Sequence, residues 1–193
     1  MMRYLKLLKN GQGWVSQMDN NKQNKYDSSI ITRLESQNDD EIIEALEYLK
    51  SDIDIAKYQI DRLLTIFKFT KNFKIKHILA ILLHDIGDIK ALPILISEIT
   101  NPFNKTHRGT LIYACEAFNC SEYLDLFITL VQDENYEVAM TCSLVFEAMT
   151  GTFNKKLLKE NIKKLKEKLN NLNNSYEDCI KDAIMILKTK IQF

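Results

Sequence analysis

One pattern runs through the middle of the chain: short amphipathic helices follow one another with only a few turn residues between them. The expected helices cover residues 72–87, 88–100, 106–118, 121–133 and 135–149. In each, apolar side chains recur three and four positions apart, as Ile75, Ile78 and Leu82 do in the first. This spacing gathers the apolar side chains on one face of a helix. The segment therefore predicts consecutive helices, each of which buries one face against its neighbours.

The expected helix starts are also periodic. Asp54, Asp88 and Ser121, which are good N-cap residues, stand 34 and 33 positions apart. A second series contains Asp39, Asn72 and Thr106, which stand 33 and 34 positions apart. Two interleaved series with one period indicate a repeated helix pair, and such a pair must stack on other pairs to bury its apolar faces. We predict an all-α fold, an α-solenoid of about five helix pairs.

The two ends of the chain differ from this middle part. Residues 1–27 are polar after a short apolar start, so we expect a flexible N-terminal arm. Residues 28–193 are expected to form a single α-helical repeat domain. Within it, a short helix is expected at 28–36, a Lys-rich helix at 155–172 and a last helix at 176–191.

Composition excludes several classes of protein. With 5 Gly and 2 Pro in 193 residues, the chain is too poor in turn formers for a sandwich or barrel. The formal net charge is zero, so the molecule as a whole is not a polyanion binder. No apolar run approaches the roughly 20 residues that span a bilayer, and the first residues do not resemble a signal peptide. The four cysteines occupy core-like positions, which favours reduced thiols and a cytoplasmic location.

The repeats resemble those of bacterial HEAT-repeat proteins. Residues 88–95 match the first helix of such a repeat, with a proline in an Asp-x-x-Ala-Leu-Pro start, and residues 135–138 resemble the start of a second helix. The likeness covers residues 39–150. The Asp and Arg usual early in the second helix are incomplete, and only Arg108 stands near such a place. The resemblance implies a HEAT-like fold and does not specify a function.

A narrower resemblance concerns residues 107–114, 119–121 and 135–138. These segments are similar to those of small bacterial HEAT-like proteins, several of which are associated with polymorphic or contact-dependent toxins as immunity proteins. The resemblance implies an immunity protein that binds a cognate toxin and occludes its active site. A general protein-interaction or regulatory scaffold is the alternative, and a nucleic-acid-binding repeat module is a weaker one.

The charge pattern supplies the candidate surface. Between residues 109 and 154 there is no Lys or Arg, whereas seven acids occur: Glu116, Glu122, Asp125, Asp133, Glu134, Glu137 and Glu147. An acidic surface of this kind steers a basic partner, such as a toxin nuclease that binds phosphates. The alternative is an ordinary solvated face.

Arg108 stands alone in front of this acidic block. It is expected either to pair with Glu137 or Asp133 of the next repeat, or to contact the partner, because Arg and Tyr are frequent at interface hot spots. The candidate partner-binding residues are His107, Arg108, Tyr113, Glu116, Asp133, Glu134, Tyr136 and Glu137.

Other chemistry has little support in the sequence. The Lys-rich residues 155–168 contain no stacking aromatic, so a solvated face or an intramolecular partner of the acidic helices is favoured there over a nucleic-acid or membrane patch. His77 and His84 lie two helical turns apart, and the Cys115–Cys120 spacing has no second close pair, so no metal site is expected. No phosphate loop or nucleophile motif occurs. We expect neither an enzyme nor a bound cofactor.

Overall fold

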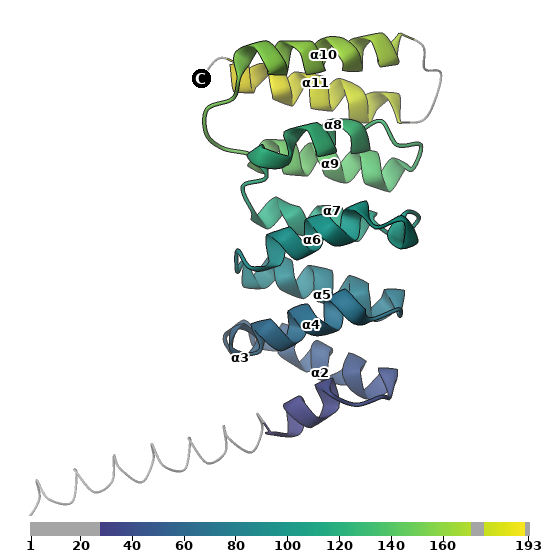
Figure 1. Ribbon diagram of the computed structural model, residues 1–193, viewed down its shortest axis with the longest axis vertical. Coiled ribbons are helices and arrows are strands. Elements are labelled where there is room, and N and C mark those ends of the chain that lie inside the picture. Colours follow the sequence, from purple (N-terminus) through teal and green to yellow (C-terminus); the bar gives the residue numbers. More distant parts are fainter. Residues whose placement is uncertain (1–27, 171–175, 192–193) are drawn as a thin grey trace, which may run out of the picture. The chain divides into compact units, whose positions relative to one another are not determined.

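A computed structural model describes residues 28–170 and 176–191, and every extended regular element in these residues is a helix (Figure 1). The predicted all-α fold is therefore confirmed. The expected N-terminal arm, residues 1–27, lies outside the described residues. In the described part of the chain, no helix combines the length and the apolar character needed to cross a membrane.

The described residues divide into two compact units, with the boundary between residues 48 and 49. In the first unit, residues 28–34 are helical and are followed by the start of α2 (Asp39–Ser51). Three acids begin α2, where the helix dipole favours them, as the sequence predicts. Arg33 and Glu44 form an exposed ion pair of 3.4 Å within this unit. The single domain expected over residues 28–193 stays a prediction.

The second unit contains the remaining helices. They are α3 (Ile53–Tyr58), α4 (Ile60–Phe69), α5 (Phe73–Ile86), α6 (Ala91–Thr100), α7 (Gly109–Ala114), α8 (Leu124–Leu130), α9 (Tyr136–Ala148), α10 (Lys155–Leu169) and α11 (Glu177–Ile191). Short 3-10 turns, η1 (Pro102–Asn104), η2 (Cys115–Ala117) and η3 (Ser121–Tyr123), stand before or after α7 and α8.

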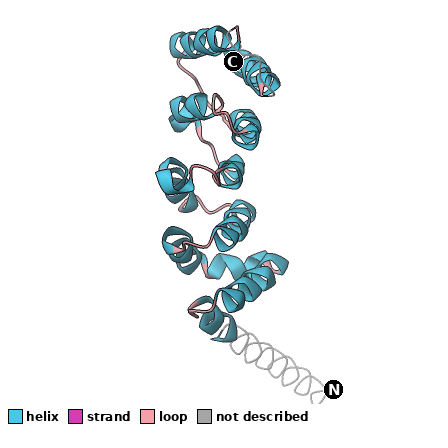
Figure 2. Ribbon diagram, turned by 90° about the vertical axis from the view of Figure 1, so that its right-hand side faces the viewer, coloured by secondary structure: helices cyan, strands magenta, loops and turns pink. Residues whose placement is uncertain are grey.

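Within this second unit the helices pack in two rows. Helices α5, α7, α9 and α11 contact one another in sequence, while α4 contacts α6 and α8 contacts α10. Consecutive helices also pair across the rows: α4 with α5, α6 with α7, α8 with α9 and α10 with α11. Figure 2, in which many of these helices are seen nearly end-on, shows the two rows. The more specific HEAT-like solenoid of about five pairs stays a prediction.

The core lies between the two rows and is built from the predicted apolar stripes. Phe67, Leu79, Phe127 and Phe146, from α4, α5, α8 and α9, are completely buried. Each such side chain stabilises the fold by about 1.5–3 kcal/mol relative to an exposed position. Packing between rows therefore supplies most of the stability of helices that are too short to persist alone.

Asparagine caps begin several helices. Asn72 accepts from the backbone N–H groups of Lys74 and Ile75, and Asn135 caps α9 in the same way. Gly87 ends α5 in the left-handed region, with φ 67°, which only glycine adopts at little cost. The expected helices 72–87 and 135–149 are thus confirmed to within their cap residues.

The starts expected at four other positions are wrong. Asp52 rather than Asp54 caps α3, by accepting from Ile55 N at 3.2 Å. Asp88 accepts from Lys90 N at 2.9 Å in a turn, and α6 begins only at Ala91.

The second pair of errors has a similar cause. Thr106 precedes α7, and Ser121 opens the 3-10 turn η3 rather than an α-helix. In these places short side chains or 3-10 turns satisfy the backbone locally and delay the helix. The Lys-rich helix α10 ends at Leu169, and the expected end at residue 172 lies outside the described residues.

Candidate interaction surface

An ion pair between Arg108 and Asp133 joins two successive helix pairs. Arg108 immediately precedes α7, and Asp133 lies in the turn between α8 and α9. Their side chains are only 15% and 20% exposed. The second carboxylate oxygen of Asp133 accepts from Asn135 N at 3.0 Å, and Asn135 caps α9. Of the two partners considered for Arg108, the structure selects Asp133, and this pair fixes the start of α9 relative to α7.

The Glu137 side chain lies against Gly109, the first residue of α7. A Cβ atom added to Gly109 would lie 2.3 Å from Glu137 Cδ, so the absence of a side chain at Gly109 makes room for this carboxylate side chain. Thr110 Oγ1 stands 3.5 Å from Glu137 Oε1. The Glu137 side chain therefore covers Gly109, although Glu137 as a whole is exposed.

A second cluster lies at the other end of α7. The Tyr113 ring stacks on His84 of α5, with ring centroids 4.8 Å apart. His84 Nε2 stands 3.7 Å from Glu116 Oε2, and His84 Nδ1 stands 2.9 Å from Asp85 Oδ1. These contacts hold Tyr113 and Glu116 against the surface of α5, in partly exposed positions.

Helix α9 presents an exposed apolar stripe beside acidic residues. Tyr136 and Met140, one turn apart, are 53% and 42% exposed. Glu134 precedes the helix and is exposed, as is Glu137. Other sides of α9 contact α7, α8 and α11. Of the predicted site residues, Glu134, Tyr136 and Glu137 at this face are exposed, and so is His107.

The predicted site residues therefore divide into separate groups. Arg108, Asp133 and Glu137 come together, with Glu134 and Tyr136 adjacent in the chain, whereas Tyr113 and Glu116 belong to the cluster on α5. His107 lies elsewhere again, because its ring stacks on Phe73 with centroids 3.9 Å apart.

The acidic block also does not form one cluster. Its members lie on η2, η3, α8, the α8–α9 turn and both ends of α9. Several of the carboxylates are engaged inside the molecule: Asp125 accepts from Asn161 Nδ2 at 3.0 Å, and Asp133 pairs with Arg108. The acids that remain most available to a partner include Glu122, Glu134 and Glu147, which are exposed.

The Lys-rich helix α10 buries Leu158, Ile162 and Leu165 and exposes its lysines. A hollow of about 300 Å³ lies between α10 and α11. It is lined by Lys159, Ile162, Lys163, Lys166, Lys188 and Ile191. Among the described residues, no three His, Cys, Asp or Glu side chains are arranged to hold a metal ion.

The sequence reasoning missed a group of aromatic and basic side chains at the end of α4, the start of α5 and the two connections α4–α5 and α6–α7. All of them are exposed except the half-buried Phe73. The group, termed the basic–aromatic edge, consists of Lys68, Phe69, Lys71, Phe73, Lys74, Phe103, Lys105 and His107. A signal existed, since Lys and Phe alternate over residues 68–74 and no acid occurs between residues 62 and 84 or between 99 and 115.

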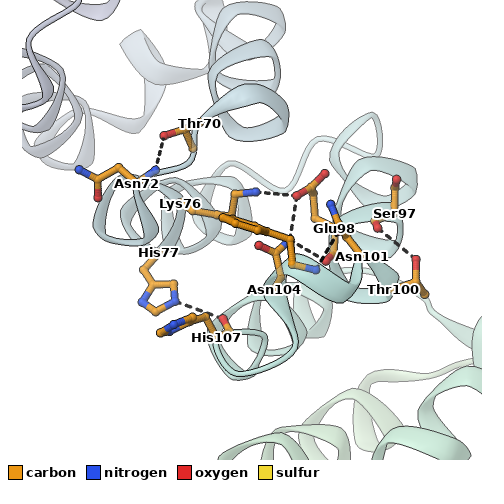
Figure 3. Close-up of polar contacts among 11 residues, drawn as sticks. Thr70, Asn72, Lys76, His77, Ser97, Glu98, Thr100, Asn101, Asn104 and His107 are labelled. Atoms are coloured by element: carbon orange, nitrogen blue, oxygen red, sulfur yellow. Dashed lines mark hydrogen bonds and ion pairs between the residues drawn. The ribbon is translucent and has the colours of Figure 1, made fainter.

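Behind this edge lies a buried polar network. Lys76 Nζ is 2.5 Å from Glu98 Oε2, and the two side chains are 3% and 8% exposed. Asn104 Nδ2 donates to the same carboxylate oxygen at 2.8 Å and to the Glu98 backbone oxygen at 2.9 Å. Figure 3 shows these three side chains converging between α5, α6 and η1. The network fixes the α6–α7 connection to the body of the unit.

Comparison with known proteins assigns no family. No protein-family model matches the chain, and no curated protein matches it.

Proposed function

We propose that the chain is a HEAT-like protein-binding scaffold and, in its most specific form, a cytoplasmic immunity protein that neutralises a bacterial toxin by covering its active site. The observation that carries the binding proposal is the open face of α9, where exposed Tyr136 and Met140 stand beside Glu134 and Glu137. The immunity assignment rests on the sequence resemblance. The four buried free thiols suit the cytoplasm.

The proposed mechanism combines apolar anchors with charge steering. Tyr136 and Met140 would enter a recess of the partner, since aromatic and Met side chains are enriched at the centres of interfaces. Glu134 and Glu137 would attract a basic partner and raise its association rate. The Arg108–Asp133 pair holds the start of α9 in place beforehand, which lowers the cost of ordering on binding.

The test is a capture experiment with full-length tagged protein and matched variants. Wild type, Tyr136→Ala and Glu134→Lys are compared with two controls: Tyr58→Ala, on the 87% exposed tyrosine of α3, and Glu160→Lys, on an exposed acid of α10 outside the acidic block. We expect one stoichiometric partner, with affinity reduced about tenfold or more by Tyr136→Ala and unchanged by both controls. Equal retention by every variant would place the interface elsewhere and overturn the proposal.

The immunity form has its own test. The captured partner, or its C-terminal region, is expressed in cells with and without this chain. We expect growth arrest in its absence, growth in its presence, and renewed arrest with the Tyr136→Ala variant. A partner that is harmless when expressed alone would leave a general interaction scaffold as the function.

A further inference from the structure

We propose that the basic–aromatic edge binds single-stranded nucleic acid. This proposal is independent of the α9 face, because it rests on different side chains, which lie where α4 meets α5 and in the α6–α7 connection. Exposed Phe rings and lysines without neighbouring acids match a ligand that alternates flat bases with phosphates.

The aromatic part of the edge is a short stack of rings. The Phe73 ring lies between those of Phe103 and His107, with centroids 5.2 Å and 3.9 Å away and interplanar angles of 17° and 28°. Phe103 is 48% exposed, and Phe69, just before the α4–α5 connection, is 67% exposed. A nucleobase adds to such a stack through its own π face, whatever its identity.

The basic part of the edge consists of four lysines, two of which lie over its rings. Lys71 Nζ stands 5.0 Å from the Phe103 ring centroid, and Lys68 Nζ stands 5.5 Å from that of Phe69. Lys74 and Lys105 are exposed. None of these four lysines forms an ion pair with a carboxylate of the described residues, so their charges are available to phosphates.

The connection that carries Phe103 is held rigidly from behind. Asn101 Oδ1 accepts from Phe103 N at 3.0 Å, and the completely buried Asn104 donates to Glu98, which also pairs with Lys76. His77 Nε2 stands 3.2 Å from the His107 backbone oxygen (Figure 3). The rings are therefore preorganised, which limits the ordering cost of binding.

Single strands fit this edge better than duplexes, because bases inside a duplex do not offer their faces to protein rings. The edge also differs from α10, which is richer in lysine but contains no aromatic side chain. The zero net charge of the chain does not oppose binding, since screening restricts the relevant charges to those within about 10 Å.

The test measures binding of fluorescent oligo(U) RNA and oligo(dT) DNA to the full chain at low salt, with a duplex of equal length alongside. We expect binding of the single strands, and the two arms show whether RNA or DNA is preferred. Phe103→Ala should weaken binding about fivefold or more, as loss of one stacked base does. Raising salt from about 50 to about 200 mM should weaken binding about 20- to 50-fold, for three or four phosphate contacts.

Variants of the edge are compared with control variants elsewhere on the surface, so that loss of binding can be assigned to the edge. The paired change Lys71→Glu/Lys105→Glu should abolish measurable binding, whereas Lys156→Glu/Lys159→Glu on α10 and Tyr58→Ala should leave it unchanged. A strand containing 2-aminopurine should lose fluorescence on binding to wild type and retain more of it with Phe103→Ala, which reports base stacking directly. Because Phe103, Lys71 and Lys105 are exposed, the variants are expected to fold.

Four outcomes would overturn the proposal. They are absence of oligonucleotide binding at low salt, binding lost only in the α10 variant, duplex binding as tight as single-strand binding, and binding to anionic phosphatidylserine vesicles in place of oligonucleotides. The last would identify the edge as a membrane contact.

Discussion

The ammonium group of Lys76 and the carboxylate of Glu98 meet 2.5 Å apart in the interior, between α5 and α6. Asn104 completes the pair by donating to the same carboxylate oxygen. Buried pairs of this kind carry a large desolvation cost, so each partner depends on the other. The pair thereby joins the body of the second unit to the connection that presents Phe103.

Removing one member of this pair should be strongly destabilising. Glu98→Ala leaves a buried ammonium unpaired, and we expect the free energy of unfolding to fall by about 3–5 kcal/mol. The double variant Lys76→Met/Glu98→Leu should recover most of this loss because no buried charge remains. Urea unfolding followed by circular dichroism measures both. A Glu98→Ala protein as stable as wild type would contradict the assigned pairing.

The Arg108–Asp133 pair should behave as a coupled link between helix pairs. Arg108→Ala and Asp133→Ala are each expected to lower the free energy of unfolding by about 1.5–3 kcal/mol, the range for hydrogen bonds to charged groups. A double-mutant cycle should show that the losses are not additive. Arg108→Lys should be little more stable than Arg108→Ala, because a lysine lacks the planar array of N–H donors of the guanidinium group. Additive losses would show that the two side chains act separately.

A side chain at position 87 should lower the stability of the protein. The φ of Gly87, 67°, lies in the left-handed region, although nothing within 3.4 Å blocks an added Cβ. Gly87→Ala is therefore expected to lower the free energy of unfolding by about 1 kcal/mol through backbone strain alone. Gly87→Asn should cost less, since Asn accepts this conformation more readily. Thermal unfolding of the two variants distinguishes strain from packing, because Asn is the larger residue.

The buried thiols should make the protein less stable at alkaline pH. Burial raises the pKa of Cys142. For Cys115, a side-chain hydrogen bond with the Cys120 thiol and then burial raise the pKa well above 9.0, the ordinary value. Because the pKa is raised in the folded state, the contribution of these thiols to the free energy of unfolding is fully present below pH 9. It declines above pH 9, where the same thiols ionise in the unfolded chain but stay neutral in the folded protein. We expect the ionisation of each of these two thiols, Cys115 and Cys142, in the unfolded chain to lower the free energy of unfolding by about 1.4 kcal/mol by about pH 10.

Unfolding in urea between neutral pH and about pH 10 measures this effect. Cys142→Ala should show a smaller alkaline loss of stability than wild type, once each protein is compared with its own neutral value. The native thiols should also react with a disulfide reagent only as fast as the protein unfolds. Rapid reaction of all four thiols at neutral pH would contradict their burial.

Several features of the fold could be predicted because they depend on neighbours in the chain. The caps at Asn72 and Asn135 and the terminating Gly87 are local, since each acts on backbone groups within four residues. The recurrence of apolar residues three and four positions apart identified the buried faces of the helices for the same reason. Helix starts at Asp54 and Thr106 were wrong where a competing local turn formed instead.

The candidate sites could be predicted less well, because they depend on contacts between residues that are distant in the chain. Sequence reasoning identified Asp133 as one of two possible partners of Arg108, but charge alone could not choose between it and Glu137. It also treated the acidic residues 116–147 as one surface, because adjacency in sequence does not reveal that alternate helices belong to different rows.

Sequence by itself determined the helical class and the identity of the buried faces, because both follow from backbone periodicity and local hydrogen bonding. Only the tertiary structure decided which side chains meet. Phe73 and Phe103 lie 30 residues apart and stack because packing of α5 against α7 brings their connections together. Contacts between distant residues depend on how the rows of helices pack, and no short-range pattern in the sequence specifies that arrangement.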